Sequence, residues 1–197
     1  RAMDAVLAIA VPIALTLGVG ASLIIRIAFG QSFAPSVTSL RLLAPAFVLT
    51  YVTMLQASVL VRIGRGWVLT AIVVATMLLS PLLNLALIPL GLSTFGTGGA
   101  GIGASIAQLL TEFFSVAAMT WVLRGHVLDR TTLVHFGKMV VAAMVVIAAH
   151  VAMLPLHGWR YPIDVLLYVS IVVGWGAVDV RAWAEVIRRA LRREPLS

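Results

Sequence analysis

The stretch that decides the fold is NLALIPLGLSTFGTGGAGIGASIAQLLTE, from Asn84 to Glu112. An apolar run meets Pro89 and Gly91, passes through a loop of glycine and small polar residues, and resumes as a second apolar run. One carboxylate, Glu112, lies deep inside that second run. Two long apolar runs joined by a short turn predict a pair of membrane-spanning helices, because about 20 mostly apolar residues cross a bilayer core of about 30 Å.

The composition of the whole chain also indicates a membrane protein. Of its 197 residues, 61% are hydrophobic and 11% are charged, whereas an ordinary soluble domain has about 25% charged residues. There is no cysteine, and the four histidines show no ligand spacing, so we expect no disulfide, no metal site and no cofactor. The net charge of +7 comes from basic residues between the apolar runs and in the tail, which favours membrane topology over nucleic-acid binding.

Six apolar runs are each long enough to cross a membrane, which predicts an all-α, polytopic bundle of six spans. The runs are Ala5–Ile25, Val37–Leu60, Trp67–Leu90, Gly99–Leu123, Met139–Leu156 and Pro162–Val180. Counted by alternate connections, eleven Lys and Arg residues fall on one side and three, Arg26, Arg41 and Arg160, on the other. Basic residues favour the cytoplasmic side, so both termini are predicted to be cytoplasmic.

We divide the chain into three parts: a four-helix part at 1–123, an additional helix pair at 124–180 and a basic tail at 181–197. In the tail, apolar residues follow helical spacing and arginines lie on the other face. The pattern predicts a short helix on the inner leaflet, with a partner-binding helix as the alternative. The arginines expected to meet anionic lipid are Arg188, Arg189, Arg192 and Arg193.

Polar residues inside the predicted spans gather into stripes at helical spacing. One stripe holds Gly101, Ser105, Gln108, Glu112 and Ser115, a second Thr76, Ser80 and Asn84, and a third Thr50, Thr53 and Gln56. At about 1.5 Å per residue from the outer end of each helix, Glu112 and Thr50 lie about 20 Å deep and Ser80 about 16 Å deep. Lipid offers no hydrogen bonds, so we expect the stripes to share a polar cavity. The candidate lining residues are Glu112, Gln108, Ser105, Asn84, Ser80, Thr50 and Arg41.

Each feature also has a plainer interpretation. Ser and Thr in apolar helices often bond their own backbone, Gly99, Gly103 and Ala107 are typical of close helix packing, and a helix cap explains Asn84 equally well. An ionised acid at mid-bilayer costs about 2.5–3.5 kcal/mol, so we expect Glu112 to be protonated, bonded to Gln108 or paired with a base outside this sequence. A transport role and a structural hydrogen bond both stay open for it. Arg41, about 6 Å down its helix, is too shallow for a direct bridge to Glu112.

Three motifs carry a resemblance to a known family. They are IRIAFGQSFAPS (Ile25–Ser36), VLVRIGRG (Val59–Gly66), and LNLALIPLG (Leu83–Gly91) followed by GGAGIGASIAQLLTE (Gly98–Glu112). In this order and spacing, residues 1–123 resemble the C-terminal half of polysaccharide flippases of the multidrug/oligosaccharidyl-lipid/polysaccharide exporter superfamily. The resemblance implies part of the C-terminal lobe of a twelve- to fourteen-helix exporter, with the N-terminal lobe outside this sequence.

The resemblance further implies a multi-pass bacterial inner-membrane transporter, not an enzyme, that flips lipid-linked oligosaccharide by alternating access. It makes Arg41 the candidate cation for the sugar pyrophosphate, and it places Glu112 at the family's glutamate. The alternatives are a multidrug and toxic compound extrusion cation antiporter, a lipid II flippase of the same superfamily, and a membrane-embedded glycosyl- or acyltransferase. That last chemistry needs clustered acids or a paired base near one interface. The acids near the span ends, Asp4, Asp129, Asp164 and Asp179, are scattered.

Overall fold

The computed structural model describes residues 2–123 continuously and, beyond them, residues 138, 141, 144–147, 149, 166–168, 170, 171 and 174. Every element in this described part is helical, which confirms the all-α class. The tail at 181–197 and most of the pair at 124–180 lie outside the described residues. The elements are α1 (Ala2–Val19), α2 (Ala21–Ala28), the 3-10 helix η1 (Gln31–Phe33), α3 (Ser36–Arg62), α4 (Gly66–Phe95) and α5 (Gly99–Val122).

Three of the predicted spans have helices with nearly the expected ends. α3, α4 and α5 are each long and apolar enough to cross a membrane, and the α1–α2 pair adds a fourth span if it is counted as one. Because these helices combine spanning length with apolar composition, they fit a membrane protein. The count of six spans and the position of the termini stay predictions.

The first predicted span, Ala5–Ile25, is not one straight helix. The chain bends by 71° between the α1 and α2 helices, at Gly20. A Cβ atom at Gly20 would stand 2.6 Å from the backbone carbonyl oxygen of Thr16, so this bend needs the residue without a side chain. The apolar run continues unbroken across the bend, and therefore hydropathy alone predicted a single span.

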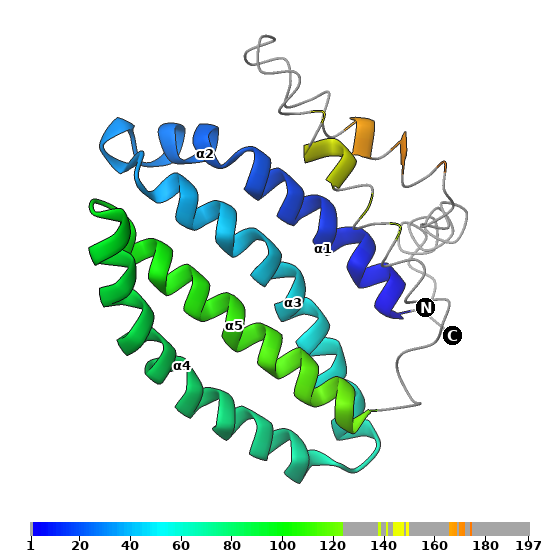
Figure 1. Cartoon of the computed structure of the whole chain (residues 1–197). Coiled ribbons are helices and arrows are strands. Elements are labelled where there is room, and N and C mark those ends of the chain that lie inside the picture. The colour runs from blue at the N-terminus through cyan, green and yellow to red at the C-terminus, as the bar shows by residue number, and fades with distance from the viewer. Residues whose placement is uncertain are drawn as a thin grey trace.

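The helices lie side by side in the order α1, α3, α5, α4 (Figure 1). α5 therefore lies between α3 and α4, while α1 covers the opposite side of α3. Ser39 at the start of α3 is next to Gly101 at the start of α5, and Gln56 near the end of α3 bonds Thr120 near the end of α5. α3 and α5 thus run parallel, and α4 returns antiparallel to both.

The turn between α4 and α5 is shorter than predicted. We expected a loop over 91–98, but α4 continues through Pro89 and Gly91 to Phe95, and only Gly96–Gly98 connect the helices. Gly91 stays helical because it packs directly against Gly99 of α5. Pro81 and Pro89 remain inside α4, which is visibly bowed in Figure 1, as expected when proline removes backbone hydrogen bonds.

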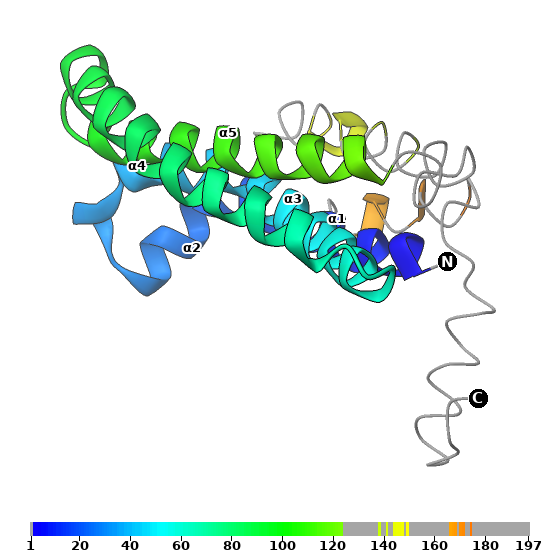
Figure 2. The ribbon, with the colours of Figure 1, turned by 90° about the horizontal axis from the view of Figure 1, so that it is seen from below.

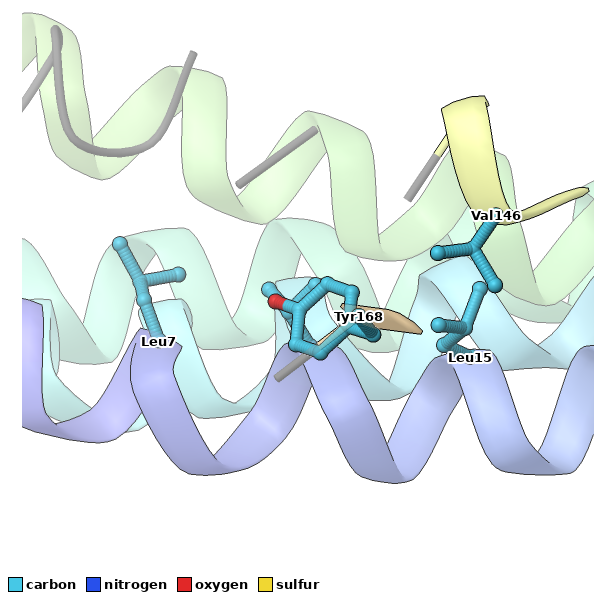
Figure 3. Packing of buried hydrophobic residues seen from close by; sticks show 5 residues of the cluster. Leu7, Leu15, Val146 and Tyr168 are labelled. Atoms are coloured by element: carbon cyan, nitrogen blue, oxygen red, sulfur yellow. The ribbon is translucent and has the colours of Figure 1, made fainter. Parts of the chain in front are cut away.

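Two apolar clusters hold the row of helices together. The first joins Leu7, Val11 and Leu15 of α1 to Val146 and Tyr168, and Figure 3 shows the side chains of Val146 and Tyr168 beside α1. The described pieces of the two later apolar runs therefore pack on the α1 side of the row. The second cluster joins α3, α4 and α5 near the α3–α4 turn through Leu60, Ile72, Met119 and Leu123.

Candidate functional site

The candidate site is built on the contact between α4 and α5, which small residues bring unusually close. A Cβ atom added at Gly99 or at Gly103 would overlap the backbone carbonyl of Gly91 or of Leu87, respectively. Gly99, Gly103 and Ala107 are all buried. The plainer interpretation of this stripe is therefore correct: its small residues let two helix backbones touch.

The contact becomes polar toward the middle of the helices. The hydroxyl groups of Thr76 on α4 and Ser115 on α5 lie 3.1 Å apart, so the Thr76 stripe faces α5. Ser80 and Asn84 follow Thr76 at four-residue intervals and are half-buried. The Asn84 amide donates to the backbone carbonyl of Ser80, and α4 continues well beyond it. Asn84 is therefore not a helix cap.

Gln108 and Glu112 form a hydrogen-bonded pair on α5. The Gln108 Nε2 donates to the Glu112 Oε1 at 3.1 Å, as anticipated from their spacing of one helical turn. Gln108 is exposed and Glu112 is half-buried. No other hydrogen bond to Glu112 is formed by the described residues, so the second carboxylate oxygen can accept from a ligand.

The pair lies on the face of α5 that points into the angle between α3 and α4. Met119 follows Glu112 by seven residues, or about two turns, and so shares its face. Met119 belongs to the buried cluster with Leu60 of α3 and Ile72 of α4. We call the face with Ser105, Gln108, Glu112 and Met119 the inner face of α5. Ser105 on this face is buried, and its hydroxyl bonds the Gly101 carbonyl.

The neighbouring helices bring the predicted stripes to similar levels. The contacts of Gly101 with Ser39 and of Thr120 with Gln56 fix the register of α5 on α3, and by interpolation Thr50 lies level with Glu112. Because α4 is antiparallel to α5, the Thr76–Ser115 contact likewise places Ser80 level with Thr111, within one residue of Glu112. Thr50 is half-buried, and its hydroxyl bonds the Ala46 carbonyl.

Arg41 lies apart from this pair. Its side chain is exposed near the start of α3, and no hydrogen bond or ion pair joins it to Glu112 in the part of the chain that the structure describes. Arg41 is therefore available to water or to an anionic group at the end of the bundle where η1 lies.

One connection between helices was not predicted from the sequence. The Gln56 Nε2 donates to the Thr120 hydroxyl at 2.7 Å, and Gln56 is only 1% exposed. Three buried polar atoms on α3 have no partner among the described residues: Ser39 Oγ, Thr53 Oγ1 and Gln56 Oε1. Thr120 is isolated in an apolar segment, so spacing along its own helix could not identify it as a partner of Gln56. That pairing could be predicted only from the register of α3 on α5.

Gln56→Leu removes two opposing contributions: a bond between helices that is worth about 0.6 kcal/mol, and a buried carbonyl oxygen without a partner. We therefore expect this variant to change the free energy of unfolding by less than about 1 kcal/mol. Gln56→Ala, which leaves a space beside Leu60, should be the more destabilising of the two. Denaturant unfolding of the purified protein measures both, with the exposed Ser58→Ala as control. Equal losses in the two variants would contradict this account.

Comparison with protein-family models, with curated proteins and with solved structures finds no match to this chain.

Proposed function

We propose that the chain is part of a membrane transporter, not an enzyme, that flips lipid-linked oligosaccharide across a bacterial inner membrane by alternating access. We further propose that the inner face of α5 lines its path. The specific substrate follows from the resemblance of the three sequence motifs to polysaccharide flippases. The observation that carries the site is the Gln108–Glu112 pair, a carboxylate and a carboxamide held together in the angle between α3 and α4.

The location of the acid supports a functional role. Glu112 is the only acidic residue in 5–123, and it lies midway along a helix long and apolar enough to cross a membrane. A charge facing lipid at that depth would cost about 2.5–3.5 kcal/mol. A polar path on the inner face would surround the carboxylate with water and substrate hydroxyl groups instead of lipid.

The pair has suitable chemistry for a sugar or a cation. With Gln108 donating to one carboxylate oxygen, the other oxygen of Glu112 and the carbonyl of Gln108 can accept hydrogen bonds from hydroxyl groups. The same two oxygens could hold a proton or a monovalent cation. Arg41, exposed toward one end of α3, supplies the charge that would meet a pyrophosphate near the entrance to the path.

A complementation assay tests this proposal. The full-length gene is expressed in a flippase-null strain, and surface polysaccharide is measured at matched expression. We expect Glu112→Gln to lower export by about tenfold, since it removes the charge at the centre of the path, and Arg41→Ala to lower export to a smaller extent. Phe113→Leu, one residue from Glu112 and exposed on another face of α5, is the matched control. Normal export by both site variants would refute the site assignment.

Cation antiport is the second candidate, and the isolated carboxylate favours it, because such an acid can alternate between a proton and a cationic substrate. In that case the wild-type protein would fail to restore polysaccharide export. It would instead raise resistance to cationic drugs, and Glu112→Gln would abolish that resistance. The same strain can be scored for both properties.

A further inference from the structure

α2 is a short helix that leaves the direction of the helix row. It has eight residues and follows α1 after a bend of 71°. Figure 2 shows it projecting away from the row formed by α1, α3, α5 and α4. Its buried residues are Ala21 and Ile25, one turn apart, so one side of α2 rests against the protein and the opposite side does not.

By its length alone, α1 accounts for most of the first crossing. α1 has 18 residues, or about 27 Å of helix, close to the hydrocarbon thickness of about 30 Å. When α1 crosses the membrane, Gly20 lies near the bilayer surface. The bend then directs α2 nearly along the membrane plane, since eight residues at 71° advance only about 4 Å along the axis of α1.

The position of α3 also places α2 near the bilayer surface. A Cβ atom at Gly18 would touch Ala44 at 3.4 Å, which is eight residues, or about 12 Å, into α3. α3 has 27 residues, or about 40 Å, so it exceeds the hydrocarbon core by about 10 Å in total. With that excess shared between its ends, α2 lies within a few ångströms of the boundary between headgroups and acyl chains.

Large apolar side chains are exposed on α2 and on the residues that follow it. Ile27 is 76% exposed, Phe29 58% and Phe33 51%, and the rings of Phe29 and Phe33 lie 5.7 Å apart. Ile27 is two positions from the buried Ile25 and so points to the opposite side of the helix. In water this group would form an exposed apolar patch, whereas the acyl boundary of a bilayer would cover it.

The remaining side of α2 is polar and basic. Ser22 and Arg26, four residues apart, share a face between the buried and the exposed apolar sides, and Arg26 is exposed. No acidic residue occurs in 5–111, so nothing in that segment neutralises this arginine. A guanidinium group is suited to hydrogen-bond phosphate. We infer that α2 and η1 form an interfacial element that inserts Ile27, Phe29 and Phe33 at the acyl boundary and holds the phosphate group of an anionic lipid at Arg26.

The absence of cysteine from the chain allows a direct test. Single-cysteine variants Ile27→Cys, Phe33→Cys and Gln31→Cys of the full-length protein are labelled with bimane and placed in phosphatidylcholine vesicles. We expect brominated phosphatidylcholine to reduce the fluorescence at positions 27 and 33 about twofold, because bromine on the acyl chains quenches only groups that touch lipid. Position 31, in the polar turn, should be quenched little. Absence of quenching at both 27 and 33 would overturn the interfacial placement.

A second arm tests the anionic lipid. In vesicles of mixed phosphatidylcholine and phosphatidylglycerol, one basic residue near the surface contributes about 1 kcal/mol, or an enrichment of anionic lipid of about fivefold. Brominated phosphatidylglycerol should then quench position 27 more strongly than brominated phosphatidylcholine at the same mole fraction. Arg26→Gln should remove that preference while leaving the quenching by phosphatidylcholine intact. Equal quenching by the two lipids beside Arg26 would overturn the assignment of an anionic lipid. Neither arm requires transport activity, so the outcome is independent of the proposed function.

Discussion

Gly103→Ala is expected to destabilise the protein by about 3 kcal/mol, at the upper end of what overpacking costs. A single methyl group at this position would overlap the carbonyl oxygen of Leu87 and approach the Cα atom of Ile88. Both neighbours are backbone atoms of α4, and no change of rotamer can move them. The two helices must therefore separate along the part of the contact where Gly91 and Gly99 also meet.

The matched control is Gly66→Ala at the start of α4. No atom lies within 4 Å of a Cβ atom at Gly66, and alanine favours a helix over glycine by about 1 kcal/mol, so this variant should be unchanged or slightly more stable. Thermal melting of the full-length protein in detergent, followed by size-exclusion chromatography, measures both. A melting temperature for Gly103→Ala equal to that of Gly66→Ala would mean that α4 and α5 are not in backbone contact.

The helices were predictable because their signals are local. Runs of about 20 apolar residues gave α3, α4 and α5 with ends close to those observed. The bend at Gly20 and the continuation of α4 past Gly91 were not predictable in this way. Both depend on what a glycine touches, the Thr16 carbonyl in one case and Gly99 in the other, and hydropathy carries no information about such contacts.

The candidate site was predictable in part. Spacing along a single helix was enough to pair Gln108 with Glu112 and to place Ser80 and Asn84 on one stripe. It could not show that Ser115 packs against Thr76 of α4. Nor could it connect Gln56 with Thr120. Such assignments need the relative rotation of neighbouring helices, which the close glycine contacts set.

Leu60→Ala is expected to destabilise the protein by about 2–5 kcal/mol, the usual cost of truncating a buried leucine. Leu60 is fully buried and lies in the cluster with Ile72, Met119 and Leu123, where α3, α4 and α5 meet beside the α3–α4 turn. α3 and α4 have few direct contacts elsewhere. The space left by the truncation would therefore loosen three helices at once.

Val61→Ala supplies the matched control, because Val61 is the next residue on the same helix and is 60% exposed. Its truncation should change stability by less than about 0.5 kcal/mol. Urea unfolding of the full-length protein in mixed micelles gives both values. The difference between the two variants also bears on the inner face of α5, since Met119 lies about two turns from Glu112 on that face. If Leu60→Ala behaved like Val61→Ala, Leu60 would not hold α3, α4 and α5 together. The placement of Glu112 in the angle between α3 and α4 would then lose its support.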